Sequence, residues 1–327
     1  MSFEKTGVSP VFLHPCSGYF IQNKKVSSIV IWQTSRYALN LTQPKIMGIV
    51  NVTPDSFSDG GCYLSADGSV LAALAHCEQL IGDGADILDI GGESSRPGAP
   101  PVSLDEELAR VLPVVRHAVS LGVPISVDTY KPRVMQAVLD LGADIINDIW
   151  ALRQPGAVSV VASHKRCGVC LMHMHGNPQT MQAAPMQGDV VAQVRAFLTL
   201  AAADLQVAGI DRGRIVLDVG IGFGKTVAQN FSLLAHQATL LDMGFPLLSG
   251  WSRKSSLTAV CGGAPKSALV TLPADRVVPS VVAAVLALER GARVVRVHDA
   301  RETVQALRVW AAVSAPDLAH QYANGSP

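Results

Sequence analysis

One short phrase recurs three times along the chain and limits what the chain can fold into. Its copies are Gly84-Ala-Asp-Ile-Leu-Asp89, Gly142-Ala-Asp-Ile-Ile-Asn147 and Gly291-Ala-Arg-Val-Val-Arg296. Each copy follows a stretch with a helical pattern, and glycine is the usual residue just past a helix end. The aliphatic run that comes next is typical of a strand buried on both faces of a parallel sheet. A polar residue then stands at a fixed offset, near the C-terminal end of the strand.

The rest of the chain repeats this rhythm. The candidate strands are Ile46–Asn51, Asp86–Ile90, Ile125–Asp128, Asp144–Asp148, Gly168–His173, Arg214–Asp218, Pro246–Gly250 and Arg293–Val297. Helical patterns lie near residues 66–82, 104–120, 132–141, 156–165, 189–208, 229–243, 276–290 and 301–312. Eight strands that alternate with eight helices predict a (β/α)8 TIM barrel, and an open doubly wound sheet is the alternative.

Two regions stand outside the rhythm. Residues 1–43 lack it, although Ser27–Trp32 and Tyr37–Leu41 can pair as a hairpin that closes the bottom of the barrel. Residues 261–275 contain glycine and proline and predict a loop within the seventh helical segment. We therefore divide the chain into an N-terminal extension of unknown role (1–34), one barrel domain (35–315) and a flexible C-terminal tail (316–327).

Charge and hydropathy exclude several classes of function. The chain has 26 Lys plus Arg and 26 Asp plus Glu, so its formal net charge is zero. Nucleic-acid binding and a polybasic membrane anchor both need a basic surface, so neither is expected. No apolar run approaches the roughly 20 residues that span a bilayer, and the start of the chain lacks signal-peptide features. We expect a cytoplasmic protein that acts on small molecules.

Polar residues follow nearly every predicted strand, at the barrel end where such folds carry their active sites. One set offers carboxylates and an amide that suit the N–H edge of a flat heterocycle: Asp128, Asn147 and Asp218. The other set offers donors that suit a phosphate or diphosphate: Asn51, Arg96, Lys254, Arg296 and His298. Together they predict an enzyme that acts on a nitrogen heterocycle carrying a phosphorylated group.

Two other patterns look like binding motifs but lack required features. Gly220–Thr226 resembles a phosphate loop, yet Val219 stands where a Walker motif needs glycine. A Cys-x-x-Cys-x-x-His run has metal-like spacing, but Cys170 and His173 should point to opposite faces of an extended strand. A loosely held Mg²⁺ shared with a diphosphate fits the sequence better, with Asn51 as an oxygen donor.

Several segments together resemble the dihydropteroate synthase family. Ile46–Gly61 is similar to the first family signature, and Gly91–Gly98 is similar to the second. Further similar segments follow in the expected order: Ile125–Thr129, Ile145–Asp148, Leu171–Met174, Gly222–Lys225, Ser252–Ser255 and Arg296–His298. The likeness covers about residues 35–312, which is the whole of the predicted barrel.

The resemblance implies a reaction. Family members join p-aminobenzoate to (7,8-dihydropterin-6-yl)methyl diphosphate, which gives 7,8-dihydropteroate and diphosphate in folate biosynthesis. Mg²⁺ is the implied cofactor, sulfonamides are implied competitors of p-aminobenzoate, and a homodimer through late helices is the implied assembly. We expect substitution by a dissociative route, because diphosphate is a good leaving group once its charge is neutralised.

The resemblance also implies a role for each site residue. The pterin contacts are Asp128, Asn147, Met172, Asp218, Phe223 and Lys254. The diphosphate contacts are Asn51, Ser95, Arg96, Arg296 and His298, with Mg²⁺ beside Asn51. The p-aminobenzoate pocket is lined by Pro97, Phe223, Lys254 and Ser255. We expect catalysis to rest on Asn51, Ser95, Arg96, Asp128, Asp218, Lys254, Arg296 and His298.

Three residues depart from the family pattern without removing any residue assigned to chemistry. Ser95 stands where threonine is usual, Val219 where proline is common, and Trp251 where smaller residues are frequent. Two rival functions remain, namely a pterin-binding methyltransferase domain and a non-catalytic paralogue. The predicted diphosphate ligands argue against the first rival, and the intact ligand set argues against the second.

Overall fold

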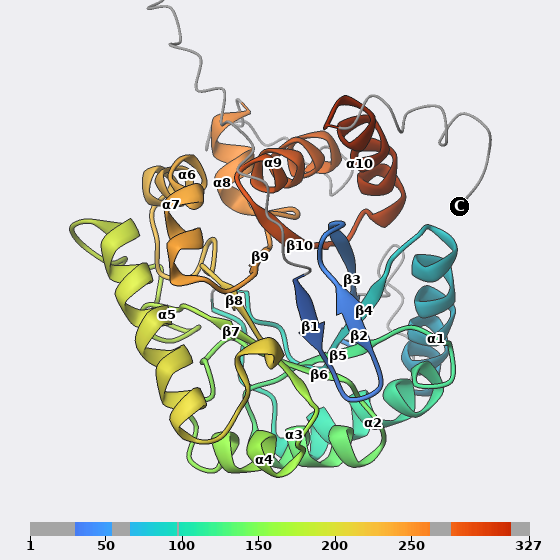
Figure 1. Cartoon of the computed structure of the whole chain (residues 1–327). Helices are drawn as coiled ribbons and strands as arrows, with labels where there is room; N and C mark the ends of the chain where they lie inside the picture. Colours follow the sequence, from blue (N-terminus) through green and yellow to red (C-terminus); the bar gives the residue numbers. More distant parts are fainter. Residues whose placement is uncertain (1–29, 54–65, 97, 262–275, 315–327) are drawn as a thin grey trace, which may run out of the picture.

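The computed structural model is a closed eight-stranded barrel surrounded by helices (Figure 1). It describes residues 30–53, 66–96, 98–261 and 276–314. The barrel strands are β3 (Lys45–Asn51), β4 (Ile87–Gly91), β5 (Ile125–Asp128), β6 (Ile145–Asp148), β7 (Gly168–Met172), β8 (Ile215–Asp218), β9 (Leu247–Ser249) and β10 (Ala292–Val297). All neighbours are parallel, and β10 pairs with β3 to close the ring. The predicted TIM barrel is confirmed, and closure rules out the open sheet.

The helices lie outside the strands. They are α1 (Ala66–Gly82), α2 (Leu104–Ala118), α3 (Pro132–Asp140), α4 (Ala157–Ser163), α5 (Val190–Val207), α6 (Val227–Ala235), α7 (Gln237–Leu240), α8 (Ser255–Val260), α9 (Val277–Glu289) and α10 (Ala300–Ser314). The helix predicted over 229–243 is divided, because the backbone leaves helical geometry at His236 (φ −102°, ψ 12°). The seventh helical segment consists of α8 and α9. Nearly all of the loop predicted over 261–275 lies outside the described residues.

The glycines of the repeated phrase do what the sequence predicts. Gly84, Gly142 and Gly291 have φ values of +95°, +101° and +89°, a region that side chains with a Cβ seldom adopt. The amide of each glycine donates to a carbonyl in the last turn of the preceding helical segment. The chain therefore reverses at each glycine and enters the barrel strand that follows.

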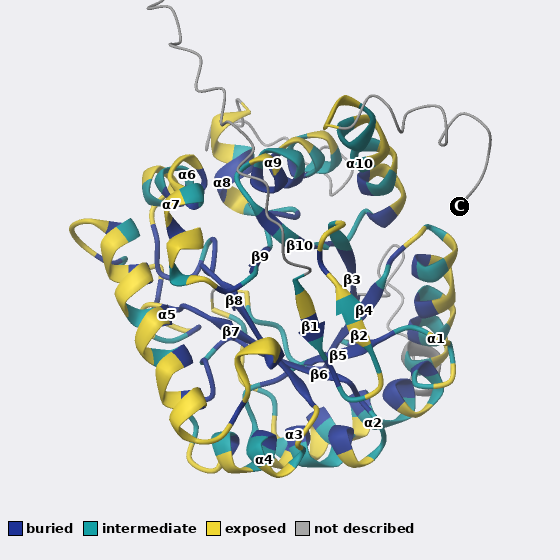
Figure 2. Cartoon of the chain, in the orientation of Figure 1, coloured by how far each residue is buried: buried dark blue, intermediate teal, exposed yellow. Residues whose placement is uncertain are grey.

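The core has two layers, which Figure 2 shows as buried strands inside half-buried helices. The larger layer packs the outer faces of the strands against the helices. The smaller layer fills the inside of the barrel with one side chain from most strands, together with two side chains from the N-terminal hairpin. Its buried members are Trp32, Leu41, Met47, Ile87, Ile145, Cys170, Val216, Leu248 and Val294. Cys170 therefore points into the barrel, whereas the His173 ring packs against Phe197 of α5, so the two side chains lie on opposite faces as predicted.

A hairpin covers the end of the barrel where the strands begin (Figure 1). Its strands β1 (Ile31–Gln33) and β2 (Ala38–Asn40) are antiparallel. The Trp32 side chain is 1% exposed, and its indole Nε1 donates to the carbonyl of Arg214 at 2.9 Å. The predicted hairpin and its closing role are confirmed. It begins within the stretch that we set aside as an extension.

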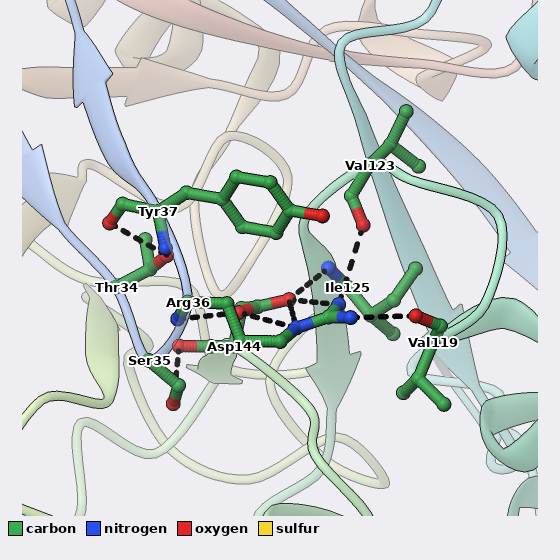
Figure 3. Close-up of polar contacts among 8 residues, drawn as sticks. All are labelled: Thr34, Ser35, Arg36, Tyr37, Val119, Val123, Ile125 and Asp144. Atoms are coloured by element: carbon green, nitrogen blue, oxygen red, sulfur yellow. Dashed lines mark hydrogen bonds and ion pairs between the residues drawn. The ribbon is translucent and has the colours of Figure 1, made fainter.

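One ion pair fastens the turn of this hairpin to the barrel (Figure 3). The Arg36 guanidinium grips both carboxylate oxygens of Asp144, with Nη2 to Oδ2 at 2.6 Å and Nε to Oδ1 at 3.1 Å. The same carboxylate accepts from the amides of Arg36 and Ile125, each at 2.9 Å. Asp144 is fully buried, so its charge depends on these four donors.

One described helix, α5, is long and apolar enough by length and composition to cross a membrane. Its buried residues recur at helical spacing: Val190, Val194, Leu198, Ala202 and Leu205. This is the pattern of a helix that packs one face on the core of its own domain.

We predict that Asp144→Ala lowers the free energy of unfolding by about 3 kcal/mol, because it leaves the Arg36 guanidinium and the amides of Arg36 and Ile125 without their acceptor. The measurement is urea denaturation. Asp140→Ala is the matched control, because Asp140 is exposed and should cost less than about 0.5 kcal/mol. Equal effects of the two substitutions would contradict this account of the hairpin.

Candidate active site

The predicted site residues lie at the C-terminal ends of the barrel strands, an end that we call the barrel mouth. Asn51 ends β3, Asp128 ends β5, Asn147 lies in β6, Met172 ends β7, Asp218 ends β8 and Arg296 lies in β10. The turns that follow the strands carry Ser95, Arg96, Phe223, Lys254 and His298, and Ser255 begins α8. Pro97 lies outside the described residues.

Arg296 joins three strands at the mouth. Its Nε donates to Asp89 Oδ2 at 2.5 Å, and its Nη2 donates to Asp128 Oδ2 at 2.9 Å. Asn147 Nδ2 donates to the same Asp89 oxygen at 3.1 Å. Asp89 is fully buried, so its charge is held in place by these donors. Within the described part of the chain, no acceptor takes a hydrogen bond from the remaining Arg296 nitrogen, Nη1.

Burial raises the pKa of two acids at the mouth. Burial raises the pKa of Asp128 to about 7, while the Arg296 guanidinium opposes this rise and the nearby Asp89 carboxylate adds to it. Burial also raises the pKa of Asp218, against the hydrogen bond from the Gly220 amide to its Oδ1 at 2.8 Å. Both acids therefore need their donors and cations to stay ionised.

Lys254 lies over an aromatic ring. Its Nζ is 4.3 Å from the centroid of the Phe223 ring, a cation–π geometry. Burial lowers the pKa of Lys254 to about 8, although the charge of Asp218 opposes this change. Phe223 belongs to a buried apolar cluster with Ile149, Met172, Met174 and Met181. The site thus pairs carboxylates and a cation with a flat apolar wall, which suits a planar heterocycle.

His298 is held by hydrogen bonds to Ser252. The Ser252 hydroxyl accepts from the His298 amide at 3.1 Å, and it lies 2.9 Å from the ring nitrogen Nδ1. Burial lowers the pKa of His298 well below its usual value, and the charges of Arg253 and Arg296 lower it further. A neutral ring whose Nδ1 accepts from the hydroxyl carries its proton on Nε2, which can donate to an anion.

The turn before Lys254 is held in an uncommon conformation. Arg253 has φ +58°, and its side chain pairs with Asp299, with Nη2 to Oδ1 at 2.6 Å. Its amide donates to Ser280 Oγ at 2.9 Å. Arg253 therefore points to the helical shell while its neighbours Ser252 and Lys254 serve the mouth.

The loop after β4 is held by a second ion-pair cluster. Lys131 pairs with Glu93 of this loop and with the fully buried Glu107 of α2. Thr129 Oγ1 donates to Glu107 at 2.6 Å, and Tyr130 OH donates to Glu93 at 3.0 Å. These contacts hold the start of the loop that carries Ser95.

Not every predicted residue is joined to the others. Arg96 and Ser255 are exposed, and among the described residues no hydrogen bond links Ser95, Arg96 or Ser255 to the rest of the site. The described residues also contain no group of three or more His, Cys, Asp or Glu side chains that could hold a metal.

Asp89 is the residue that the resemblance does not single out. Asp89 accepts hydrogen bonds from both Arg296 and Asn147, so it holds two of the predicted ligands in position. The repeated phrase holds the signal, because Asp89, Asn147 and Arg296 occupy the same place in its three copies. Three equivalent positions on three strands thus meet in one hydrogen-bonded group.

Comparison with known proteins agrees with this geometry. The sequence profile of the family described as "Pterin binding enzyme" matches residues 47–298. A dihydropteroate synthase of Neisseria meningitidis serogroup B is 49% identical over 287 residues, covering 86% of this chain and 97% of that protein. The chain therefore belongs to the pterin-binding enzymes.

Comparison with solved structures identifies the family within the pterin-binding enzymes. A dihydropteroate synthase of Xanthomonas albilineans with 4-aminobenzoic acid has a TM-score of 0.80 and 48% identity, covering 88% of this chain and 99% of that chain. One of Burkholderia cenocepacia complexed with 7,8-dihydropteroate has a TM-score of 0.77 and 49% identity, covering 88% and 98%. Within its class the chain belongs to the dihydropteroate synthase family, as the sequence motifs predict.

We predict that Lys254 titrates near pH 8, well below the ordinary value of 10.5. Competitive labelling with acetic anhydride over a range of pH measures this pKa for the single lysine. In Asp218→Asn the Lys254 pKa should fall further, because the carboxylate that favours the ammonium is gone. An ordinary pKa in the wild type, or a rise in the variant, would contradict the burial described above.

Proposed function

We propose that this protein condenses (7,8-dihydropterin-6-yl)methyl diphosphate with p-aminobenzoate, releasing diphosphate and forming 7,8-dihydropteroate. The observation that carries the proposal is the Arg296 group, by which we mean Arg296 with its hydrogen-bonded partners Asp89, Asp128 and Asn147. In this group, acceptors that suit a pterin lie beside a guanidinium that can bind an anion. Family membership supports the reaction. The methyltransferase rival has no diphosphate to bind, so the same group argues against it.

The pterin ring would lie between acceptors and the apolar wall. Asp128 and Asp218 would take the N–H groups of the amidine-like edge, and Lys254 would donate to the ring carbonyl. The hydrogen bond from Asn147 to Asp89 supports an orientation in which the amide oxygen of Asn147 stays free for the ring. Met172 and Phe223 would cover the faces of the ring, as their shared cluster supports.

The diphosphate would be held by donors from strands on the other side of the mouth. Arg296 Nη1 and His298 Nε2 are the groups whose positions support this role best. Asn51, Ser95 and Arg96 complete the set by similarity. The amide oxygen of Asn51 would bind Mg²⁺, which when bound would neutralise part of the diphosphate charge.

The amine would enter after the leaving group departs. On this account the carbon–oxygen bond breaks first, and the pterin spreads the resulting positive charge from its exocyclic methylene into the ring. Asp128 and Asp218 would stabilise that cation. The p-aminobenzoate would lie near Phe223, Lys254, Ser255 and Pro97, where sulfonamides would compete, and its amine would attack the methylene without any covalent enzyme intermediate.

The proposal also includes an assembly and a cellular location. We infer a homodimer through the late helices, which the exposed valines Val278 and Val282 on α9 and Val309 and Val313 on α10 support. We also infer a cytoplasmic location, which the neutral net charge and the small-molecule site support.

The direct experiment mixes the protein with Mg²⁺, dihydropterin diphosphate and p-aminobenzoate and measures released diphosphate and dihydropteroate. Stoichiometric formation of both products is the expected result. Folded protein that binds the substrates without turnover would identify a non-catalytic paralogue and sink the proposal.

We predict that two substitutions separate the two halves of the site. Asp218→Ala should abolish binding of a pterin that lacks the diphosphate, because the ring loses a buried acceptor. Arg296→Lys should leave that binding within about twofold, because lysine keeps a positive charge beside Asp89 and Asp128. It should weaken the diphosphate form about tenfold, because lysine lacks the further nitrogen that Arg296 would present to the anion. Calorimetry with both ligands measures this, and normal pterin binding by Asp218→Ala would show that the ring assignment is wrong.

A further inference from the structure

The turn between β8 and α6 contains a lysine that the proposed reaction does not use. Lys225 is 2% exposed, which is rare for lysine unless its ammonium is fully hydrogen-bonded. This glycine-rich turn has Val219 where a Walker phosphate loop needs glycine, so a bound phosphate does not account for the buried charge. Its contacts supply one.

The ammonium of Lys225 is the centre of a cage of uncharged acceptors. Nζ donates to the carbonyls of Gly220 at 2.9 Å and Phe223 at 3.1 Å. It also lies 2.9 Å from His173 Nδ1 and 3.4 Å from the His173 carbonyl. Three of these contacts use the three hydrogens of the ammonium, so the side chain ties the turn to the chain that leaves β7.

His173 is fixed in the form that this contact needs. Because an ammonium only donates, Nδ1 must accept, and the ring is neutral with its proton on Nε2. Burial, together with the charge of Lys225, lowers the pKa of His173 to about 3. The ring meets Phe197 of α5 edge-on, with centroids 5.0 Å apart. His173 is therefore an anchor rather than a proton carrier.

The glycines of the turn permit this close approach. Gly220 and Gly224 both have φ +68°, and a Cβ at either position would run into the carbonyl oxygen of His173 or His175. The turn consequently lies flat on the chain segment after β7. Burial lowers the pKa of Lys225 to about 7, yet a neutral amine still has two hydrogens for the carbonyls.

The cage has a direct consequence for the proposed site. One of its carbonyls belongs to Phe223, whose ring lies beneath Lys254 Nζ at 4.3 Å. The Phe223 amide donates back to the Gly220 carbonyl at 3.1 Å, so both backbone groups of this residue are fixed. Lys225 is therefore one of the contacts that hold the turn under this ring, beside the hydrogen bonds from the Gly222 amide to Asn230 Oδ1 at 2.9 Å and from Gln182 Nε2 to the Gly222 carbonyl at 2.6 Å.

We propose that Lys225 is a positioning residue for the p-aminobenzoate side of the site, because it ties Gly220 and Phe223 to His173 and so sets the Phe223 ring beneath Lys254. The proposal rests on the proposed function. It assigns Lys225 no contact with substrate, so its effect should pass through Phe223.

The test is a double-mutant cycle with Lys225→Met and Phe223→Ala. Lys225→Met removes the donors at similar volume, and we expect KM for p-aminobenzoate to rise about tenfold with kcat within about threefold. In the Phe223→Ala background, Lys225→Met should raise KM no further, because the group it positions is absent. Lys165→Met, at an exposed lysine, is the control and should leave both parameters unchanged.

A second readout needs no turnover. Hydrogen exchange at the amide of Phe223 should be faster in Lys225→Met, because the Gly220 carbonyl that accepts from this amide is no longer held by Lys225. Lys225→Gln, which keeps amide donors, is measured beside it in case the unpaired carbonyls prevent Lys225→Met from folding, and should give intermediate exchange.

The outcomes separate the two proposals. Wild-type protein that makes no dihydropteroate would overturn the proposed function, while hydrogen exchange would still decide whether Lys225 holds the turn. Lys225 variants that fold and keep wild-type KM and exchange would overturn the proposed role of Lys225. An equal rise in KM on both backgrounds would do so as well.

Discussion

The ion pairs of Arg296 with Asp89 and Asp128 are the interaction on which the rest of the barrel mouth depends. They connect β10 to β4 and β5 at the barrel mouth. Asp89 also accepts a hydrogen bond from Asn147, which adds β6 to the group. Without the guanidinium, the buried carboxylate of Asp89 and the half-buried carboxylate of Asp128 would lose the cation that they share, and the pKa of Asp128 would rise. The group therefore fixes both the geometry of the ligand set and its charge.

The same group explains why the site suits charge separation. Under the proposed function, the Asp128 carboxylate would lie where positive charge develops on the pterin, and the Arg296 guanidinium would lie toward the departing diphosphate. Preorganised charges of this kind cost no rearrangement when the bond breaks. His298, whose pKa burial lowers well below its usual value, and Lys254, whose pKa burial lowers to about 8, add further donors to this set.

Much of this could be predicted from the sequence, because the information is local and periodic. The glycine at each helix end and the aliphatic run after it placed the strands of the repeated phrase, and parallel strands bring equivalent positions to one end of a barrel. What could not be predicted are contacts that depend on closure. The Arg36–Asp144 clamp, the Lys131 cluster and the Lys225 cage join residues far apart in sequence or depend on a turn conformation that no periodicity encodes. The left-handed turn at Arg253 is likewise set by its partners Ser280 and Asp299.

The central claim is that the site breaks the bond to diphosphate before the amine attacks. The most direct measurement is positional isotope exchange. Dihydropterin diphosphate with ¹⁸O in the position that bridges carbon and phosphorus is incubated with the protein and Mg²⁺ in the absence of p-aminobenzoate. The account predicts that the label spreads to the non-bridging positions of that phosphate, because the released group can rotate and recombine. A label that stays in the bridging position while product forms normally once p-aminobenzoate is added would contradict it.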